Sequence, residues 1–438
     1  MKPLEYSSYQ ELGQGFLAFV LMAAVGWVVC YFLSRNRPDS ASLQYKLFFG
    51  AYAIRAALSI ALYVFGYADL IGDADSVGYM YGQSLDYTWT SSGLGIFDLP
   101  AAWVTAFTGN HLGNYYLIGT LYFITGLNTR LAAAAMNCCC GALTAVFAYR
   151  VARELFNEAI ARRVGIWTCV FPSMIIWSAQ TIKEPVVILI ETVALYGSLR
   201  LRMAGFAVHR VFLTAFAVFL LLAFRFYAAY IAGVAVLAAL MVPDFKRGKV
   251  SLGAAIVIGA VLSGLVINMG LMTEQEARID MFDTQYIMDF RHNVAEEGGS
   301  GVATDFDMRT TSGFGLATLV GTAHLLLAPF PWQLGGASVR MLLTLPELVF
   351  WWYLVFAGLF PGLKYVLRWR KADTLPLLLF IVGMGLLYSM MFGNVGLIFR
   401  QRAQLLPWLF VLCSVGLELR EVRRSQVAAH GFPRPTPA

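Results

Sequence analysis

Long apolar runs separated by short polar segments extend along almost the whole chain. A membrane-spanning helix needs about 20 predominantly apolar residues, and about 11 runs reach or approach that length. They lie at residues 16–33, 47–66, 131–149, 164–179, 185–200, on both sides of Arg225, and at 251–269, 341–362, 375–392 and 403–417. The pattern therefore predicts an all-α polytopic membrane protein with about 11 transmembrane helices.

Three further apolar pieces are not expected to span. Residues 99–107 and 115–124 are short and are interrupted by glycines, which favours helices that lie in the membrane interface. If residues 314–332 spanned, the basic segment 364–371 would fall outside and violate the positive-inside rule. We therefore interpret 314–332 as re-entrant or interfacial.

Composition agrees with this pattern, since 59% of the 438 residues are hydrophobic and only 13% are charged. A soluble globular protein has about twice that charge, so a soluble class is excluded. The net charge of +6 arises from basic segments between apolar runs, as in cytoplasmic loops, and does not indicate a nucleic-acid partner. All six cysteines lie in apolar runs without disulfide or zinc spacing, and we expect them to be core residues.

The distribution of Lys and Arg predicts the topology. Arg162, Lys246, Arg370 and Arg424 are expected inside, whereas the start of the chain and two long loops, 67–128 and 270–313, are expected outside. The second loop is rich in charge and contains Gly298-Gly-Ser-Gly301, which is typical of a mobile, water-exposed lid. We expect a single membrane domain at 1–424 and a disordered cytoplasmic tail at 425–438. Arg55, near the middle of the second run, is expected to form an ion pair inside the bundle.

The first outer loop begins with an acidic stretch that holds Asp69, Asp73 and Asp75 within seven residues. Carboxylates next to a bilayer usually line a polar path or a site, so this stretch is a functional candidate. The alternative is a solvated loop in which Asp73 or Asp75 only caps a helix.

Four cations are also predicted at outer ends of spans, where Lys and Arg are normally scarce: Lys183, Arg225, Arg400 and Arg402. A phosphate-bearing ligand would explain them, because arginine offers forked donors to phosphate oxygens. Pro185 suits the first turn of a helix whose amide donors point outward toward an anion. The alternatives are contacts with lipid headgroups or pairing with Glu184.

Carboxylates that face cations suit the transfer of a sugar from a lipid phosphate to a hydroxyl group. A carboxylate takes the hydroxyl proton while cations neutralise the departing phosphate. Asp73 would be the base and Asp75 its helper, with an apolar bundle below to hold the lipid tail.

Several short motifs together resemble the GT-C superfamily of membrane glycosyltransferases. They are Gly72-Asp73-Ala-Asp75-Ser-Val-Gly-Tyr79, Lys183-Glu184, Arg225-Phe-Tyr227, Asn394-Val-Gly396 and Arg400-Gln-Arg402. The resemblance implies a polyprenyl-phosphate-sugar donor, an inverting transfer to a lipid, glycan or protein acceptor, and Asp73 as catalytic base with Asp75 as the next choice.

The resemblance also implies supporting roles for Glu184, Tyr79 and Asn394. Some members bind a divalent metal near the first-loop acid, so Mg²⁺ or Mn²⁺ could bind Asp73 and Asp75. The implied location is the bacterial inner membrane, with the active site on its outer face. The chain departs from the family by an additional span before the acidic loop and by the lack of a large soluble outer domain.

Two other classes remain open. A polysaccharide polymerase or ligase of the O-antigen type would make the arginines primary and Asp73 secondary. A flippase or transporter for lipid-linked sugars would also place charges in a bundle, but transporters usually show repeated halves with sites near the midplane.

Overall fold

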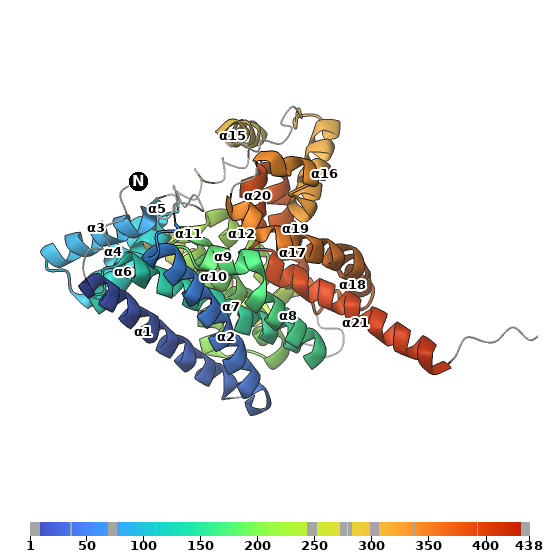
Figure 1. Cartoon of the computed structure of the whole chain (residues 1–438), viewed down its shortest axis with the longest axis horizontal. Helices are drawn as coiled ribbons and strands as arrows, with labels where there is room; N and C mark the ends of the chain where they lie inside the picture. Colours follow the sequence, from blue (N-terminus) through green and yellow to red (C-terminus); the bar gives the residue numbers. More distant parts are fainter. Residues whose placement is uncertain are drawn as a thin grey trace, which may run out of the picture.

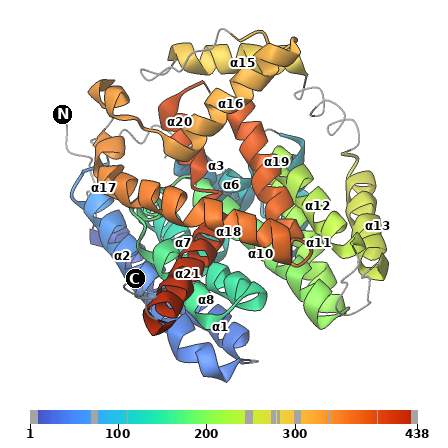
Figure 2. The ribbon, with the colours of Figure 1, turned by 90° about the vertical axis from the view of Figure 1, so that its right-hand side faces the viewer.

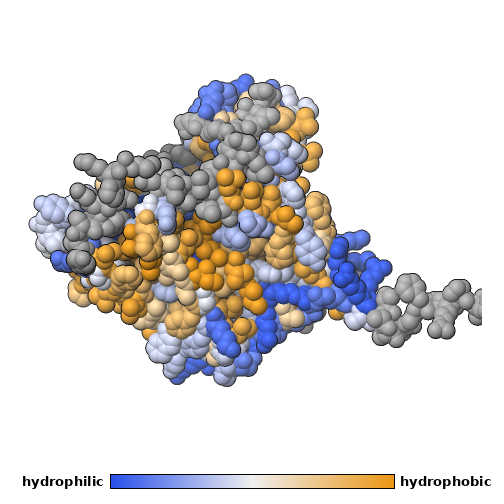
Figure 3. Space-filling model, viewed as in Figure 1, coloured by the Kyte–Doolittle hydropathy of each residue, from blue (hydrophilic) through white to orange (hydrophobic). Residues whose placement is uncertain are grey.

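The computed structural model describes residues 9–35, 37–68, 77–109, 111–242, 252–271, 278, 283–297, 306–336, 339–391 and 393–430. All the secondary-structure elements in these ranges are helices, which confirms the predicted all-α class (Figure 1). Four described helices are long and apolar enough to cross a membrane, at Gln10–Ser34, Pro38–Val64, Arg130–Leu155 and Leu345–Arg370. This architecture is compatible with a polytopic membrane protein, and Figure 3 shows an apolar band between hydrophilic surfaces.

The first half of the chain forms a bundle with several short helices on one end. The bundle consists of α1 (Tyr9–Ser34), α2 (Ala41–Val64), α7 (Arg130–Leu155), α8 (Glu158–Val170), α9 (Pro172–Ser178), α10 (Glu184–Ala204), α11 (Val208–Phe224) and α12 (Phe226–Met241). The short helices are α3 (Gly78–Ser91), α4 (Leu99–Ala102), α5 (Val104–Thr108) and α6 (Gly113–Thr125). The two weakly apolar pieces of the first outer loop are thus short helices, as the sequence predicted.

The second half packs against this bundle. It contains α13 (Leu252–Asn268), α15 (Thr284–Glu297), α16 (Thr311–Leu327), α17 (Val339–Leu354), α18 (Phe360–Tyr365), α19 (Leu375–Met391), α20 (Val395–Arg402) and α21 (Leu406–His430). Figure 2 shows α13 at the edge of the bundle, beside α11 and α12. A π-helical turn, Val355–Leu359, joins α17 to α18, and a second, Val366–Arg370, continues the same helix beyond the predicted end at residue 362.

Helix α7 lies at the centre of the bundle, in contact with α1, α2, α8 and α10. Its most apolar 18 residues are 94% buried, compared with 28% for the corresponding window of α1, so the other described helices leave most of the surface of α1 uncovered. Small residues such as Ala132–Ala135 and Cys138–Gly141 allow neighbouring helices to approach closely. Five of the six cysteines are buried and the sixth, Cys140, is partly buried, as expected for core residues.

A break in the fourth predicted span explains the buried Arg55. Helices α8 and α9 are bent by 52° at Phe171–Pro172, and proline cannot donate to the carbonyl of Thr168. Arg55 donates from Nη2 to the Thr168 carbonyl at 3.0 Å and from Nη1 to the Cys169 carbonyl at 2.8 Å. The prediction that Arg55 forms an ion pair is therefore wrong within the described part of the chain. The guanidinium instead satisfies carbonyls that the break leaves without helical donors.

Glycines let α21 contact the long helix formed by α17 and α18. A Cβ on Gly362 would lie 1.9 Å from the Leu412 carbonyl oxygen, and one on Gly416 would lie 1.9 Å from that of Gly358. Only hydrogen fits at these positions, so Gly358-x-x-x-Gly362 acts as a small-residue packing motif between membrane helices.

The basic segments predicted to lie inside converge on one end of the bundle. Arg37 and Arg200 both contact Glu154, at 3.4 and 2.8 Å. Arg163 pairs with Glu418 at 3.0 Å, and Arg370 donates to the Leu155 carbonyl at 2.6 Å. These contacts join the ends of α1, α7 and α10 to one another, α8 to α21, and the end of the helix through α18 to α7.

Residues 150–163, which separate two of the apolar runs, form little loop, because only Phe156 and Asn157 lie between α7 and α8. Arg150 is a buried helix residue that donates to the Tyr196 hydroxyl, the Leu33 carbonyl and Gln44.

The described part of the second outer loop includes α15, which sequence analysis did not predict. Arg291 on α15 is 1% exposed and donates to the carbonyls of Ser389 and Met390 at the end of α19, at 3.3 Å each. At least this part of the predicted lid is therefore attached to the bundle. The Gly298–Gly301 segment lies outside the described residues.

Helix α16 occupies most of the 314–332 segment and is shorter than the four long apolar helices, so whether it spans or is re-entrant stays a prediction. The indoles of Trp351 and Trp352 donate to the Leu326 and Leu327 carbonyls at its end. Trp351 is fully buried. An indole that caps a helix end replaces the water that the interface would otherwise supply.

Candidate functional site

Glu184 is the first residue of α10 and is fully buried. Its Oε1 accepts a hydrogen bond from Arg225 Nη2 at 2.6 Å, and its Oε2 accepts one from Arg400 Nη2 at 2.8 Å. Pro185 occupies the second position of the helix, as the sequence predicted, where its missing N–H is not needed. The carboxylate thus joins two arginines from distant parts of the chain.

Arg225 lies in the extended turn between α11 and α12. Arg225 is the single residue between the two helices, and its side chain is only 3% exposed. Besides Glu184, its Nη1 donates to Gln401 Oε1 at 2.7 Å and to the Tyr227 hydroxyl. Sequence analysis placed Arg225 at this outer end but did not predict its engagement by three side chains.

Glutamines and tyrosines extend the cluster into the bundle. Gln401 Oε1 also accepts from Gln404 Nε2 at 2.7 Å, and Gln404 Oε1 accepts from the Tyr388 hydroxyl at 2.8 Å. The sequence pattern did not predict a role for these residues. The sequence contains only a weak indication of this network: Gln401 lies between two arginines, and Gln404 follows about one helical turn later.

The cluster is electrically unbalanced. The charges of Arg400, Arg225 and Lys183 all act on Glu184, so these four side chains carry a net charge of +2. Lys183 and Arg400 are partly exposed, whereas Glu184 and Arg225 are buried. An anion that approaches from solvent would therefore meet Lys183 and Arg400 first, together with the positive end of α10. We refer to Lys183, Glu184, Arg225 and Arg400 as the outer cluster.

His111 and Arg278 border the outer cluster and were also missed. Burial, reinforced by the charges of Lys183 and Arg225, lowers the pKa of His111 from 6.5 to about 3. Its Nδ1 lies 2.8 Å from the Phe224 carbonyl, so Nδ1 carries the proton of the neutral ring and donates it. Arg278 donates to the carbonyls of Phe107 and Gly109 at 2.7 and 2.9 Å, which fixes the short helices against α11.

Arg402 is separate from the outer cluster. It is 1% exposed and donates from Nη1 to the Ala328 carbonyl at 2.8 Å, while its Nη2 lies 3.6 Å from Glu347 Oε1. Its guanidinium also lies over the Phe399 ring at 4.5 Å. Residues two apart on a helix point in different directions, so Arg400 and Arg402 of α20 cannot share a partner. The structure brings together Lys183, Arg225 and Arg400 but not Arg402.

The predicted bases Asp73 and Asp75 lie outside the described residues. The described chain stops at Ala68 and resumes at Val77, and the tyrosines close to these two points contact the same cation. The Arg130 guanidinium lies 4.2 Å from the Tyr63 ring centre and 5.2 Å from that of Tyr79. Arg130 at the start of α7 is thus a further cation that contacts described residues on both sides of the acidic stretch in the sequence.

Asn394, predicted as a supporting residue, is the N-cap of α20. Its Oδ1 accepts from the amides of Gly396 and Leu397 at 2.8 and 3.2 Å. The cap fixes the start of the short helix that carries Arg400, so its contribution to the cluster is one of positioning.

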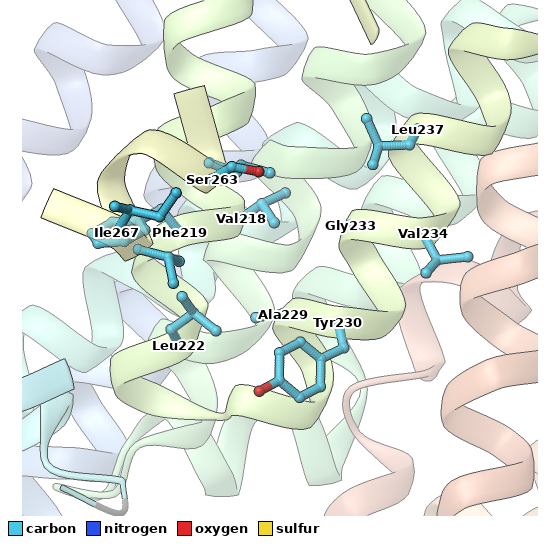
Figure 4. Close-up of a pocket in the computed structure, with 12 residues that line it drawn as sticks. Val218, Phe219, Leu222, Ala229, Tyr230, Gly233, Val234, Leu237, Ser263 and Ile267 are labelled. Carbon is cyan, nitrogen blue, oxygen red and sulfur yellow. The ribbon is translucent and has the colours of Figure 1, made fainter. Parts of the chain in front are cut away.

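An apolar groove of about 460 Å³ lies between α11, α12 and α13 (Figure 4). It is lined by Val218, Leu222, Tyr230, Leu237, Leu262 and Ile267, among others. Leu222 and Tyr230 mark the end nearest Arg278, because the Leu222 carbonyl accepts from Arg278 and the charge of Arg278 acts on Tyr230. The groove has the composition to hold a hydrocarbon chain.

Within the described ranges, no group of three or more His, Cys, Asp or Glu side chains could hold a metal ion. The predicted metal ligands Asp73 and Asp75 lie outside those ranges, so the metal site stays a prediction. No protein-family model matches the chain, and no curated protein sequence is significantly similar to it.

Proposed function

We propose that the protein is a membrane glycosyltransferase that moves a sugar from a polyprenyl-phosphate donor to a lipid, glycan or protein acceptor. It would cross the bacterial inner membrane with about 11 spans and act on the outer face. The observation that carries the proposal is the outer cluster, in which three cations act on one buried carboxylate. The donor phosphodiester carries one negative charge, and the polyprenyl phosphate that leaves carries up to two, which would balance the net charge of the cluster.

The cluster is suited to a phosphate that leaves during a reaction. Arg225 is held by Glu184, Gln401 and Tyr227, so it needs little rearrangement when charge develops. Lys183 and Arg400 add partly exposed donors that a substrate can reach. The groove between α11, α12 and α13 offers an apolar surface for the lipid chain.

In the proposed reaction, the acceptor oxygen attacks the anomeric carbon of the sugar. The carbon–oxygen bond to phosphate breaks, and the phosphate keeps the electron pair. Asp73 takes the acceptor proton, with Asp75 as its helper, while the cations of the outer cluster stabilise the departing phosphate. A divalent ion at Asp73 and Asp75, if bound, would neutralise charge beside the acceptor.

A binding measurement tests the phosphate site. The wild type in lipid nanodiscs should bind a long-chain polyprenyl phosphate and not the polyprenol of the same length, which lacks only the phosphate. Arg400→Ala should weaken binding by about 2 to 5 kcal/mol, because it removes a charge-assisted contact. Arg162→Ala is the matched control, since Arg162 lies on α8 at the opposite end and is 61% exposed.

Equal binding of the phosphate and the alcohol would refute the phosphate site. Equal binding by the wild type and Arg400→Ala would refute the assignment of that site to the outer cluster, and contacts with lipid headgroups would then explain the cations better.

A polysaccharide polymerase or ligase of the O-antigen type is the second candidate. The observation in its favour is that arginines, rather than aspartates, form the cluster among the described residues. Turnover decides between the two. If Asp73→Asn retains full transfer while Arg400→Ala is inactive, the second candidate takes first place.

A further inference from the structure

A second glutamate lies deeper in α10. Glu191 follows Glu184 by seven residues, which corresponds to about two turns, or roughly 10 Å along the helix. It is fully buried, and neither carboxylate oxygen has a hydrogen-bond partner among the described residues. This contrasts with Glu184, both of whose oxygens accept bonds from arginine. Neither the sequence motifs nor the proposed transfer reaction uses Glu191.

Groups from several elements surround this position. The charge of Arg225, at the junction of α11 and α12, acts on Glu191, and Glu191 in turn acts on Tyr388 of α19. On α10 itself, Glu184 lies toward the outer end and Tyr196 toward the inner end, where it accepts from Arg150 of α7. The remaining titratable groups of α7 near mid-span are the thiols Cys138, Cys139 and Cys140, and α9 carries none.

The protonation state follows from this environment. An ionised carboxylate that is buried without a hydrogen-bond donor costs far more free energy than the neutral acid at the same place. Arg225 opposes that cost only in part, because both of its Nη groups donate to other side chains, Glu184, Gln401 and Tyr227, and neither oxygen of Glu191 accepts a hydrogen bond from it. Glutamates inside membrane helices commonly serve ion or proton movement when they lack a fixed partner.

We propose that Glu191 is a proton-binding site inside the bundle, and that Arg225 couples it to anion binding at the outer cluster. When an anion neutralises the field of Arg225, the ionised form of Glu191 loses its main support and the proton is held more tightly. By reciprocity, a proton on Glu191 favours the anion and release of the proton opposes it. The coupling rests on the proposed phosphate site, whereas the proton site does not.

Infrared spectroscopy of the protein in lipid nanodiscs tests the proton site. The wild type at neutral pH should show a C=O absorption of a protonated carboxyl group that is absent from Glu191→Gln. Glu158→Gln is the control and should keep the band, because Glu158 is 38% exposed and paired with two arginines. If Glu191→Gln does not fold, Glu191→Met places an apolar side chain of similar length there. A spectrum that neither variant changes would overturn the proposal.

Binding of polyprenyl phosphate over a pH series tests the coupling. Once Glu191 releases its proton, wild-type affinity should fall by up to about tenfold per pH unit, and Glu191→Gln should lack this component. The ionisation of the lipid phosphate is common to both proteins and cancels in the comparison. Identical pH profiles would overturn the coupling. If neither protein binds the lipid, the phosphate site itself fails, and the infrared band still decides whether Glu191 holds a proton.

Discussion

Replacing Glu184 with glutamine tests whether the outer cluster is a stable structural unit. Glutamine keeps the size of the side chain and one acceptor oxygen but removes the charge. Arg225 and Arg400, whose side chains are 3% and 13% exposed, would then share a buried site without their carboxylate. The positive charges would repel each other, and neither could recover full hydration.

The expected loss follows from burial. Removing one partner of a buried ion pair costs about 3 to 5 kcal/mol, because an uncompensated charge stays behind. Arg225 keeps its bonds to Gln401 and Tyr227, and Arg400 is partly exposed, so we expect the lower end, about 3 kcal/mol. In a cycle with Arg225→Gln, the two changes should be less destabilising together than their sum, by about 1 to 3 kcal/mol.

The cysteines provide the assay. Cys30, Cys138, Cys139, Cys169 and Cys413 are buried, so a thiol-reactive fluorogenic dye reports unfolding in mixed micelles with increasing denaturing detergent. Glu158→Gln on α8 is the matched control, since partly exposed pairs contribute about 0 to 1 kcal/mol. If Glu184→Gln unfolds no more readily than Glu158→Gln, the outer cluster does not hold α10, α12 and α20 together, and our account of it is wrong.

Asp73→Asn should lower glycosyl transfer by about 10² to 10⁴-fold with the donor still bound, because it removes the base. Asp75→Asn should lower transfer less. A chelator should reproduce both losses only if a metal ion bridges the two carboxylates. Unchanged turnover of Asp73→Asn would show that the acidic stretch has a structural role and not a catalytic one. Arg55→Met should destabilise the fold by about 2 to 6 kcal/mol in the thiol assay, because the carbonyls of Thr168 and Cys169 lose their donors. A loss of stability smaller than that of Arg162→Gln would contradict this. Burial lowers the pKa of His111 to about 3, so the unfolded chain binds more protons than the folded one between pH 6.5 and 3. The wild type should therefore lose up to about 1.4 kcal/mol per pH unit as pH falls through that window, and His111→Asn should lack this loss; equal pH profiles of unfolding would disprove it.

Local features of the chain could be read from the sequence because they depend on neighbouring residues. The apolar runs gave the all-α class, Pro185 gave the start of α10, and the glycine breaks gave the short helices of the first outer loop. Helix periodicity could also have separated Arg400 from Arg402, since side chains two positions apart point away from each other. Boundaries were less predictable. The helix through Gly362 continues to Arg370 because π-turns and packing against α21 extend it beyond its apolar core.

What the sequence alone determined is that this chain has the apolar helices of a membrane protein and that unusual charges lie near their ends. Only the tertiary structure decided which charges meet. Glu184 pairs with residues 41 and 216 positions away, and Arg55 bonds to carbonyls freed by a break more than 110 residues later. Such pairings depend on how helices pack, which hydrophobic periodicity does not specify. Among the residues that the structure describes, the same packing leaves Glu191 without a hydrogen-bond donor, although it has the same carboxyl group as Glu184.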